Sequence, residues 1–80
     1  MVEEQIMLTS IEDVKSFVAI ANTKPYDVDI ISGKYLTNAK SIMGIFSLDL
    51  TRPLNVVAYN NGEDNFLEEI DAFIYRPEER

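Results

Sequence analysis

The chain has 80 residues, 46% hydrophobic and 26% charged, so we expect a single globular domain, residues 1–80, around one apolar core. Its formal net charge of −7, with only seven lysines and arginines, argues against nucleic acid and anionic membranes as partners. The sequence has neither histidine nor cysteine, which removes the commonest catalytic bases, nucleophiles and transition-metal ligands. We therefore expect no enzyme activity, no metal site and no cofactor.

The chain opens with a predicted strand. Its first ten residues, MVEEQIMLTS, contain neither a positively charged leader nor a long apolar run, so we expect a cytoplasmic protein without a membrane span. Between Val2 and Leu8 the even positions are mostly apolar, which predicts a strand with one buried face.

A first helix is predicted next. Thr9 and Ser10 precede Glu12 and Asp13 in the spacing of a capping box, which marks a helix start. Apolar residues three and four apart then form one stripe as far as Thr23, before Pro25 stops the helix. The stripe consists of Ile11, Val14, Phe17, Val18 and Ala21.

Two strands and a short helix follow. Alternation over 26–32, a Ser32-Gly33 turn and a second run over 35–37 predict a hairpin. A short helix then begins after Ser41, its candidate N-cap, and ends before Asp49.

The last third of the chain predicts a strand and a helix. Leu54, Val56 and Ala58 face one side of a fourth strand, and a turn is expected at Asn60-Asn61-Gly62. The segment EDNFLEEIDAFIY then predicts one amphipathic helix with Phe66, Ile70, Phe73 and Ile74 on its apolar face. The order β-α-β-β-α-β-α favours an α+β fold with helices on one face of a mainly antiparallel sheet.

Acidic residues are numerous in the last segment, but their pattern is that of a solvated helix face. The stretch NNGEDN lacks the alternating acids and the distant glutamate of a calcium loop. The carboxylates on the polar face of the final helix therefore predict no catalytic pair.

The segment NAKSIMGIFSL, residues 38–48, raises two questions that the pattern leaves open. Ser41 is a favoured N-cap residue, and its position would also place an added phosphoryl group near unpaired amides and the positive end of the helix dipole. The apolar side chains that follow are too many for so short a helix to bury, so they are either deeply packed or partly exposed as a docking patch. They are Ile42, Met43, Ile45, Phe46 and Leu48.

This same segment resembles the regulatory-serine segment of HPr, the phosphocarrier of the bacterial phosphoenolpyruvate-dependent sugar phosphotransferase system. The element order is similar to the HPr fold along nearly the whole chain, which implies an HPr-like open-faced sandwich with a four-stranded antiparallel sheet. The resemblance implies phosphorylation at Ser41 by an HPr serine kinase/phosphorylase. It also implies binding of a LacI-type catabolite control protein, with partner contacts at Lys40, Ile42, Met43 and Phe46.

The chain departs from HPr at the phosphocarrier site. Glu12 stands at the position of the family histidine, Val14 at that of the arginine and Lys15 at that of the proline. Ordinary phosphocarrier activity should therefore be absent, and the resemblance implies a divergent, non-catalytic regulatory member for carbon catabolite control. Two alternatives stay open: phosphotransfer through Glu12 or Asp13 as an acyl-phosphate acceptor, and an HPr-scaffold interaction domain without phosphate chemistry.

Overall fold

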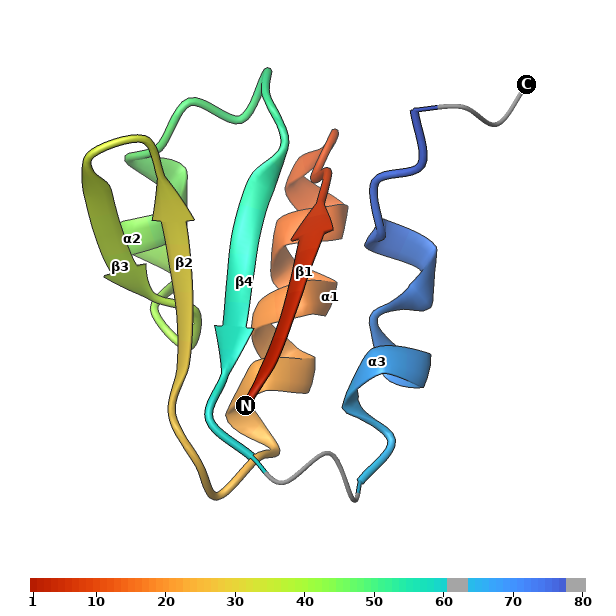
Figure 1. Cartoon of the computed structure of the whole chain (residues 1–80). Coiled ribbons are helices and arrows are strands. Elements are labelled where there is room, and N and C mark those ends of the chain that lie inside the picture. The colour runs from red at the N-terminus through yellow and green to blue at the C-terminus, as the bar shows by residue number, and fades with distance from the viewer. Residues whose placement is uncertain (61–63, 78–80) are drawn as a thin grey trace.

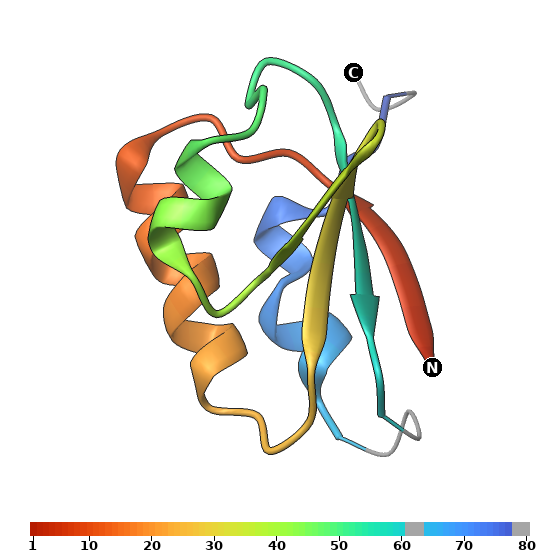
Figure 2. The same cartoon turned by 90° about the vertical axis from the view of Figure 1, so that its left-hand side faces the viewer.

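One antiparallel sheet carries helices on one side, as the computed structural model shows (Figures 1 and 2). The structure describes residues 1–60 and 64–77. The strands are β1 Val2–Ile6, β2 Val28–Ser32, β3 Tyr35–Asn38 and β4 Leu54–Ala58. The helices are α1 Ile11–Asn22, α2 Ile42–Phe46 and α3 Phe66–Glu69, followed by a 3-10 turn, Asp71–Phe73. The expected α+β open-faced sandwich is confirmed.

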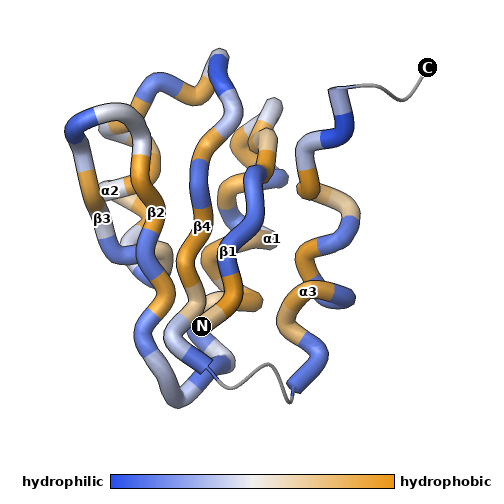
Figure 3. The backbone as a smooth tube through the Cα atoms, viewed as in Figure 1, coloured by the Kyte–Doolittle hydropathy of each residue, from blue (hydrophilic) through white to orange (hydrophobic). Residues whose placement is uncertain are grey.

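The sheet has the order β1-β4-β2-β3, so the last strand in sequence lies between the first and second. Each neighbouring pair is antiparallel, with Ile6 opposite Leu54 and Ile30 opposite Val56. These four side chains are buried on the side covered by the helices. Figure 3 shows that β1 is mostly hydrophilic, whereas the central strands β2 and β4 carry more hydrophobic residues. Central strands lose water on both edges, which favours apolar side chains there.

The apolar stripe of α1 packs on the sheet as expected, with one exception. Val14, Phe17, Val18 and Ala21 are buried, but Ile11 is 62% exposed, so its place in the buried stripe was wrong. Ile11 is the first residue of the helix, and its side chain is not among those that pack in or against the core. Ile11 therefore adds an apolar side chain to the surface.

The prediction of a single C-terminal helix is also wrong. The described segment forms one α-turn, α3, and then the 3-10 turn, and the break falls at Ile70, whose φ and ψ are −98° and 9°. Tertiary contacts decide this, because Ile74 forms a bridge to Ile6 and the amide of Tyr75 donates to the carbonyl of Gln5 at 2.9 Å. Pairing with β1 satisfies backbone groups at a sheet edge that a continued helix would leave open.

The buried side of this segment was predicted correctly. Phe66 and Ile70 are buried, while Phe73 and Ile74 are half-buried against the core. The Phe73 ring meets Phe17 of α1 edge to face, with centroids 6.2 Å apart. The turn predicted at Asn60-Asn61-Gly62 lies mostly outside the described residues. None of the helices within the described residues has the length and apolarity that crossing a bilayer requires.

Candidate functional site

Ser41 lies exposed at the start of α2 and caps it. Its Oγ accepts a hydrogen bond from the amide of Gly44 at 3.1 Å, and its carbonyl accepts from the amide of Ile45 at 3.1 Å. The amide of the buried Ala39 donates to the carbonyl of Val28 at 2.8 Å, which fixes the segment before the helix against β2. The predicted N-cap is confirmed, and its hydroxyl remains accessible to solvent.

Gly44 allows α2 to approach β3 closely, a feature that the sequence pattern alone did not explain. A Cβ at this position would clash with Oγ1 of Thr37 and lie 3.2 Å from Oγ of Ser41. Any larger residue would therefore push α2 away from the sheet or turn the serine hydroxyl aside. The only sequence signal was a glycine within a predicted helix, where glycine is otherwise unfavourable.

The apolar residues of α2 are divided between core and surface. Ile45 is fully buried, and Ile42 is half-buried against the core. Met43 is 75% exposed and Phe46 is 39% exposed. Both open alternatives for this segment thus hold in part, because one side of the helix anchors it and the other presents apolar groups to solvent.

An open groove of about 330 Å³ joins α2 to the start of α1. It is lined by Leu8, Thr9, Ser10, Ile11, Phe46, Leu50 and Thr51. The groove therefore brings Phe46 together with the segment that stands where HPr carries its histidine. Exposed Ile11 and half-buried Leu50 extend the apolar surface, and sequence reasoning assigned neither of them to it.

Asp13 closes the start of α1. Its amide donates to Oγ of Ser10 at 3.0 Å, and its Oδ2 accepts from both the amide and the hydroxyl of Thr9, at 3.1 and 3.0 Å. This is a variant of the capping box, in which the Asp13 side chain reaches the residue before the N-cap and not the N-cap amide itself. The predicted helix start is confirmed. A phosphoryl group on Oδ2 of Asp13 would displace its bonds to Thr9.

Glu12 is exposed, and its carboxylate makes no hydrogen bond or ion pair with any residue that the structure describes. Val14, at the family arginine position, is fully buried in the core, and Lys15 is exposed. A cation that would stabilise a phosphorylated Glu12 is thus not supplied from position 14.

Lys40 is turned toward the end of α1. Its ammonium donates to the carbonyl of Lys24 at 2.8 Å, and its own carbonyl accepts from Nδ2 of Asn22 at 3.2 Å. These bonds tie α1 to the segment before α2. Of the four residues named as partner contacts, Lys40 is the one whose polar group is engaged within the protein.

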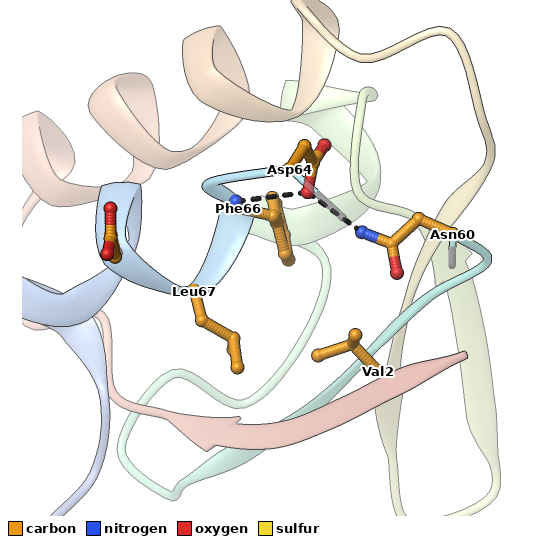
Figure 4. Close-up of a pocket in the computed structure, with 6 residues that line it drawn as sticks. Val2, Asn60, Asp64, Phe66 and Leu67 are labelled. Carbon is orange, nitrogen blue, oxygen red and sulfur yellow. Dashed lines mark hydrogen bonds between the residues drawn. The ribbon is translucent and has the colours of Figure 1, made fainter. Parts of the chain in front are cut away.

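A second polar cluster lies at the start of α3 (Figure 4). Asp64 accepts from the hydroxyl of Tyr26, from Nδ2 of Asn60 at 3.1 Å and from the amide of Phe66 at 3.2 Å. The Tyr26 hydrogen bond is the main reason that the pKa of Asp64 is lowered. Burial, and then the same bond, raises the pKa of Tyr26 to about 12.

The pocket beside this cluster measures only about 90 Å³. Ligand sites for small molecules usually exceed about 300 Å³. The described groups here are paired with one another, and Lys24 adds an ion pair to Glu69 at 3.0 Å. We therefore regard this cluster as a structural joint that holds α3 against β2 and β4.

Solved structures of HPr proteins have the same fold as this chain. HPr-C-His from Thermoanaerobacter tengcongensis superposes with a TM-score of 0.74 at 23% identity, covering 90% of this chain and 89% of that one. The phosphocarrier protein HPr of Bacillus anthracis gives 0.68 at 24% identity, covering 92% and 96%. A histidine-containing phosphocarrier protein of Mycoplasma gives 0.71 at 17% identity, covering 89% of each chain.

No family model and no curated protein matches the sequence. The structural similarity shows that this chain has the HPr fold, as the resemblance in residues 38–48 implied. At such identities the similarity speaks for the fold alone, so the roles of Ser41, Glu12 and the α2 side chains remain proposals.

Proposed function

We propose that this protein is a non-enzymatic, HPr-like regulatory module of a sugar phosphotransferase or carbon catabolite control system, acting in the cytoplasm. It binds protein partners through the outer side of α2, and phosphorylation of Ser41 switches that binding. The observation that carries the proposal is the exposed hydroxyl of Ser41 beside exposed Met43 and Phe46, in an HPr fold without histidine.

The surroundings of Ser41 support its use as the switch. The first turn of α2 is formed by Ile42, Met43 and Gly44, so an added dianion meets apolar groups and backbone amides. Like charges close to a phosphate would oppose its addition, and the α2 start brings none within its own turn. Phosphorylation would therefore change the charge of a mainly apolar contact surface.

The partners that fit this proposal are an HPr serine kinase/phosphorylase and a LacI-type transcription regulator. Met43 and Phe46 supply adaptable apolar contacts, and the groove next to Phe46 can receive an apolar side chain of a partner. Ile42 contributes only its exposed edge. Lys40 would first have to leave the carbonyl of Lys24.

Incubation with an HPr serine kinase and ATP tests the switch, with intact mass and peptide mapping as the readout. We expect one added phosphate, mapped to Ser41, and none in the Ser41→Ala variant. An authentic HPr in the same reaction serves as the positive control. If that control is modified and this protein is not, the switch is wrong.

Glu12 motivates a second candidate function, transfer of a phosphoryl group as an acyl phosphate. Glu12 is exposed in the first turn of α1, and its carboxylate is unengaged by the described residues. Because Val14 replaces the stabilising arginine, we expect no label from enzyme I and phosphoenolpyruvate. Label that disappears in Glu12→Gln but persists in Asp13→Asn would establish this second function instead.

A binding comparison separates the switch from an HPr scaffold that has lost all phosphate chemistry. If a partner binds through α2 and phosphorylation matters, phosphorylated protein and Ser41→Ala should differ in affinity. If both bind alike while Met43→Ala weakens binding, the surface is a docking module without a switch.

A further inference from the structure

The face of the sheet opposite the helices is uncovered, and it combines acidic with apolar side chains. Figure 1 looks directly onto this face, and Figure 2 shows the helices gathered on the other side. Since Ile30 and Val56 point inward, their neighbours along β2 and β4 point outward. The register sets Glu3 of β1 and Asp29 of β2 on either side of Val57.

Tyr59 stands at the acidic end of this face. It is 47% exposed, and its amide donates to the carbonyl of Asp27 at 3.0 Å. Asp29 is the main cause of a raised pKa of the Tyr59 phenol, and the charges of Asp27 and Glu3 add to it. The strand register and the backbone bond to Asp27 thus place three acidic residues in the neighbourhood of one exposed aromatic residue.

Apolar side chains continue the face away from Tyr59. Ile31 of β2 lies opposite Leu36 of β3, and Leu36 is 63% exposed. Val57, between the two acidic strands, is nearly covered. Within the four strands, all of whose residues are described, the outward positions hold no lysine or arginine. The Met1 amine at the start of β1 donates to the carbonyl of Asn60 at 2.8 Å.

The negative charge of this face limits the kinds of molecule that can bind to it. Nucleic acid and a second copy of the same face both bring negative charge against Glu3, Asp27 and Asp29. Within the described residues no three acidic groups converge on a point that could hold a metal ion. A complementary occupant carries positive charge together with apolar groups.

We propose that the open sheet face, defined by Glu3, Asp27, Asp29, Ile31, Leu36 and Tyr59, docks an arginine-bearing segment of a protein partner. A guanidinium stacks on an exposed aromatic ring and pairs with carboxylates in one plane, which matches Tyr59 and its acidic neighbours. The Asp29 carboxylate can accept more than one hydrogen bond from a guanidinium, because an ionised carboxylate has about four lone-pair sites. Apolar side chains of the segment contact Ile31 and Leu36.

This surface lies across the sheet from α2, so it does not depend on the function proposed for Ser41. A partner bound here and one bound at α2 would contact opposite sides of the molecule and would not compete for space. The acidic open face is therefore a second docking surface, which selects partners by charge. It lies opposite the mainly apolar surface of α2.

A titration of ¹⁵N-labelled protein with a capped peptide of alternating arginine and leucine tests this proposal. We expect salt-sensitive shifts of the amides of Glu3, Asp29, Leu36, Val57 and Tyr59, with those of α2 unmoved. The same peptide with lysine should bind about two- to fivefold more weakly, because the stacked planar contact is lost. The glutamate version should not bind.

Matched variants locate the effect. Glu3→Lys should weaken binding of the arginine peptide about two- to fivefold, whereas Glu68→Lys, the same charge change on exposed α3, should not. Tyr59→Phe should retain the stacking that Tyr59→Ser loses. Absence of shifts on this face at millimolar peptide, shifts centred on α2, or equal effects of the two lysine variants would overturn the proposal.

Discussion

The starts of α1 and α2 can be compared directly, because a serine is the N-cap of both helices. Each begins with a serine whose Oγ accepts from the amide three residues later, at 3.0 Å for Ser10 and 3.1 Å for Ser41. At α1 the third residue is Asp13, which returns to Thr9. At α2 it is Gly44, which packs against Thr37.

The difference shows that the same cap can serve two purposes. The α1 start is closed by hydrogen bonds and already carries the charges of Glu12 and Asp13, so further negative charge is opposed there. The α2 start is apolar and open. Neighbouring residues, and not the capping bond itself, therefore decide which serine is suited to phosphorylation.

Gly44→Ala should have the largest effect on stability, because it disturbs the close packing against Thr37 that only the α2 start has. We expect the free energy of unfolding to fall by about 1–3 kcal/mol, partly offset by the better helix propensity of alanine. Urea unfolding measures the change. In Thr37→Ala/Gly44→Ala the clash with Oγ1 is gone, so the double variant should be less destabilised than the sum of the single variants. Simple additivity would contradict the packing argument.

Removing each serine cap in turn measures how much each cap contributes to stability. Ser10→Ala should lower the free energy of unfolding by about 1–2 kcal/mol, and Ser41→Ala by about 0.5–1 kcal/mol. The α1 cap supports a helix of 12 residues, and Asp13 adds bonds to Thr9 at the same end, whereas α2 has five residues. Thermal and urea unfolding of both variants give the values. A larger loss at Ser41 would mean that its main role is structural.

The third helix start, that of α3, extends the comparison through pH and should show the smallest effect. The lowered pKa of Asp64 means that its stabilisation is present above the ordinary aspartate value of about 3.9 and is lost as pH falls through the lowered value. Between pH 5 and 2, roughly the carboxylate range, the wild type should lose stability more steeply than Asp64→Asn. Tyr26→Phe should flatten the profile in part, because it removes the main cause of the shift. Identical profiles would contradict this view of the joint.

Local patterns predicted the helix starts well, because a cap depends on residues only three or four apart. Ser10 with Asp13, and Ser41 before its apolar turn, could both be predicted from spacing. The exposure of Ile11 could not, because it depends on which distant residues pack against the first turn of α1. The break at Ile70 likewise depends on pairing of the C-terminal segment with β1, a contact between distant parts of the chain.

The candidate site was predictable only in its parts. Residues 38–48 and the segment around Glu12 stood out separately in the sequence, but the groove that joins them forms through packing of Phe46 beside Leu8 and Ile11. The open sheet face was invisible for the same reason. Glu3 and Asp29 lie in two different strands and Tyr59 directly follows a third, and only the strand order brings them together.

Phosphoserine installed during synthesis at position 41 or at position 10 tests the central claim most directly, without reliance on any kinase. The measurement is the free energy of unfolding of each phosphorylated protein relative to the unmodified one. We predict a change within about 0.5 kcal/mol for position 41 and a loss of about 1 kcal/mol or more for position 10. Equal losses at both positions, or a greater loss at Ser41, would contradict the account.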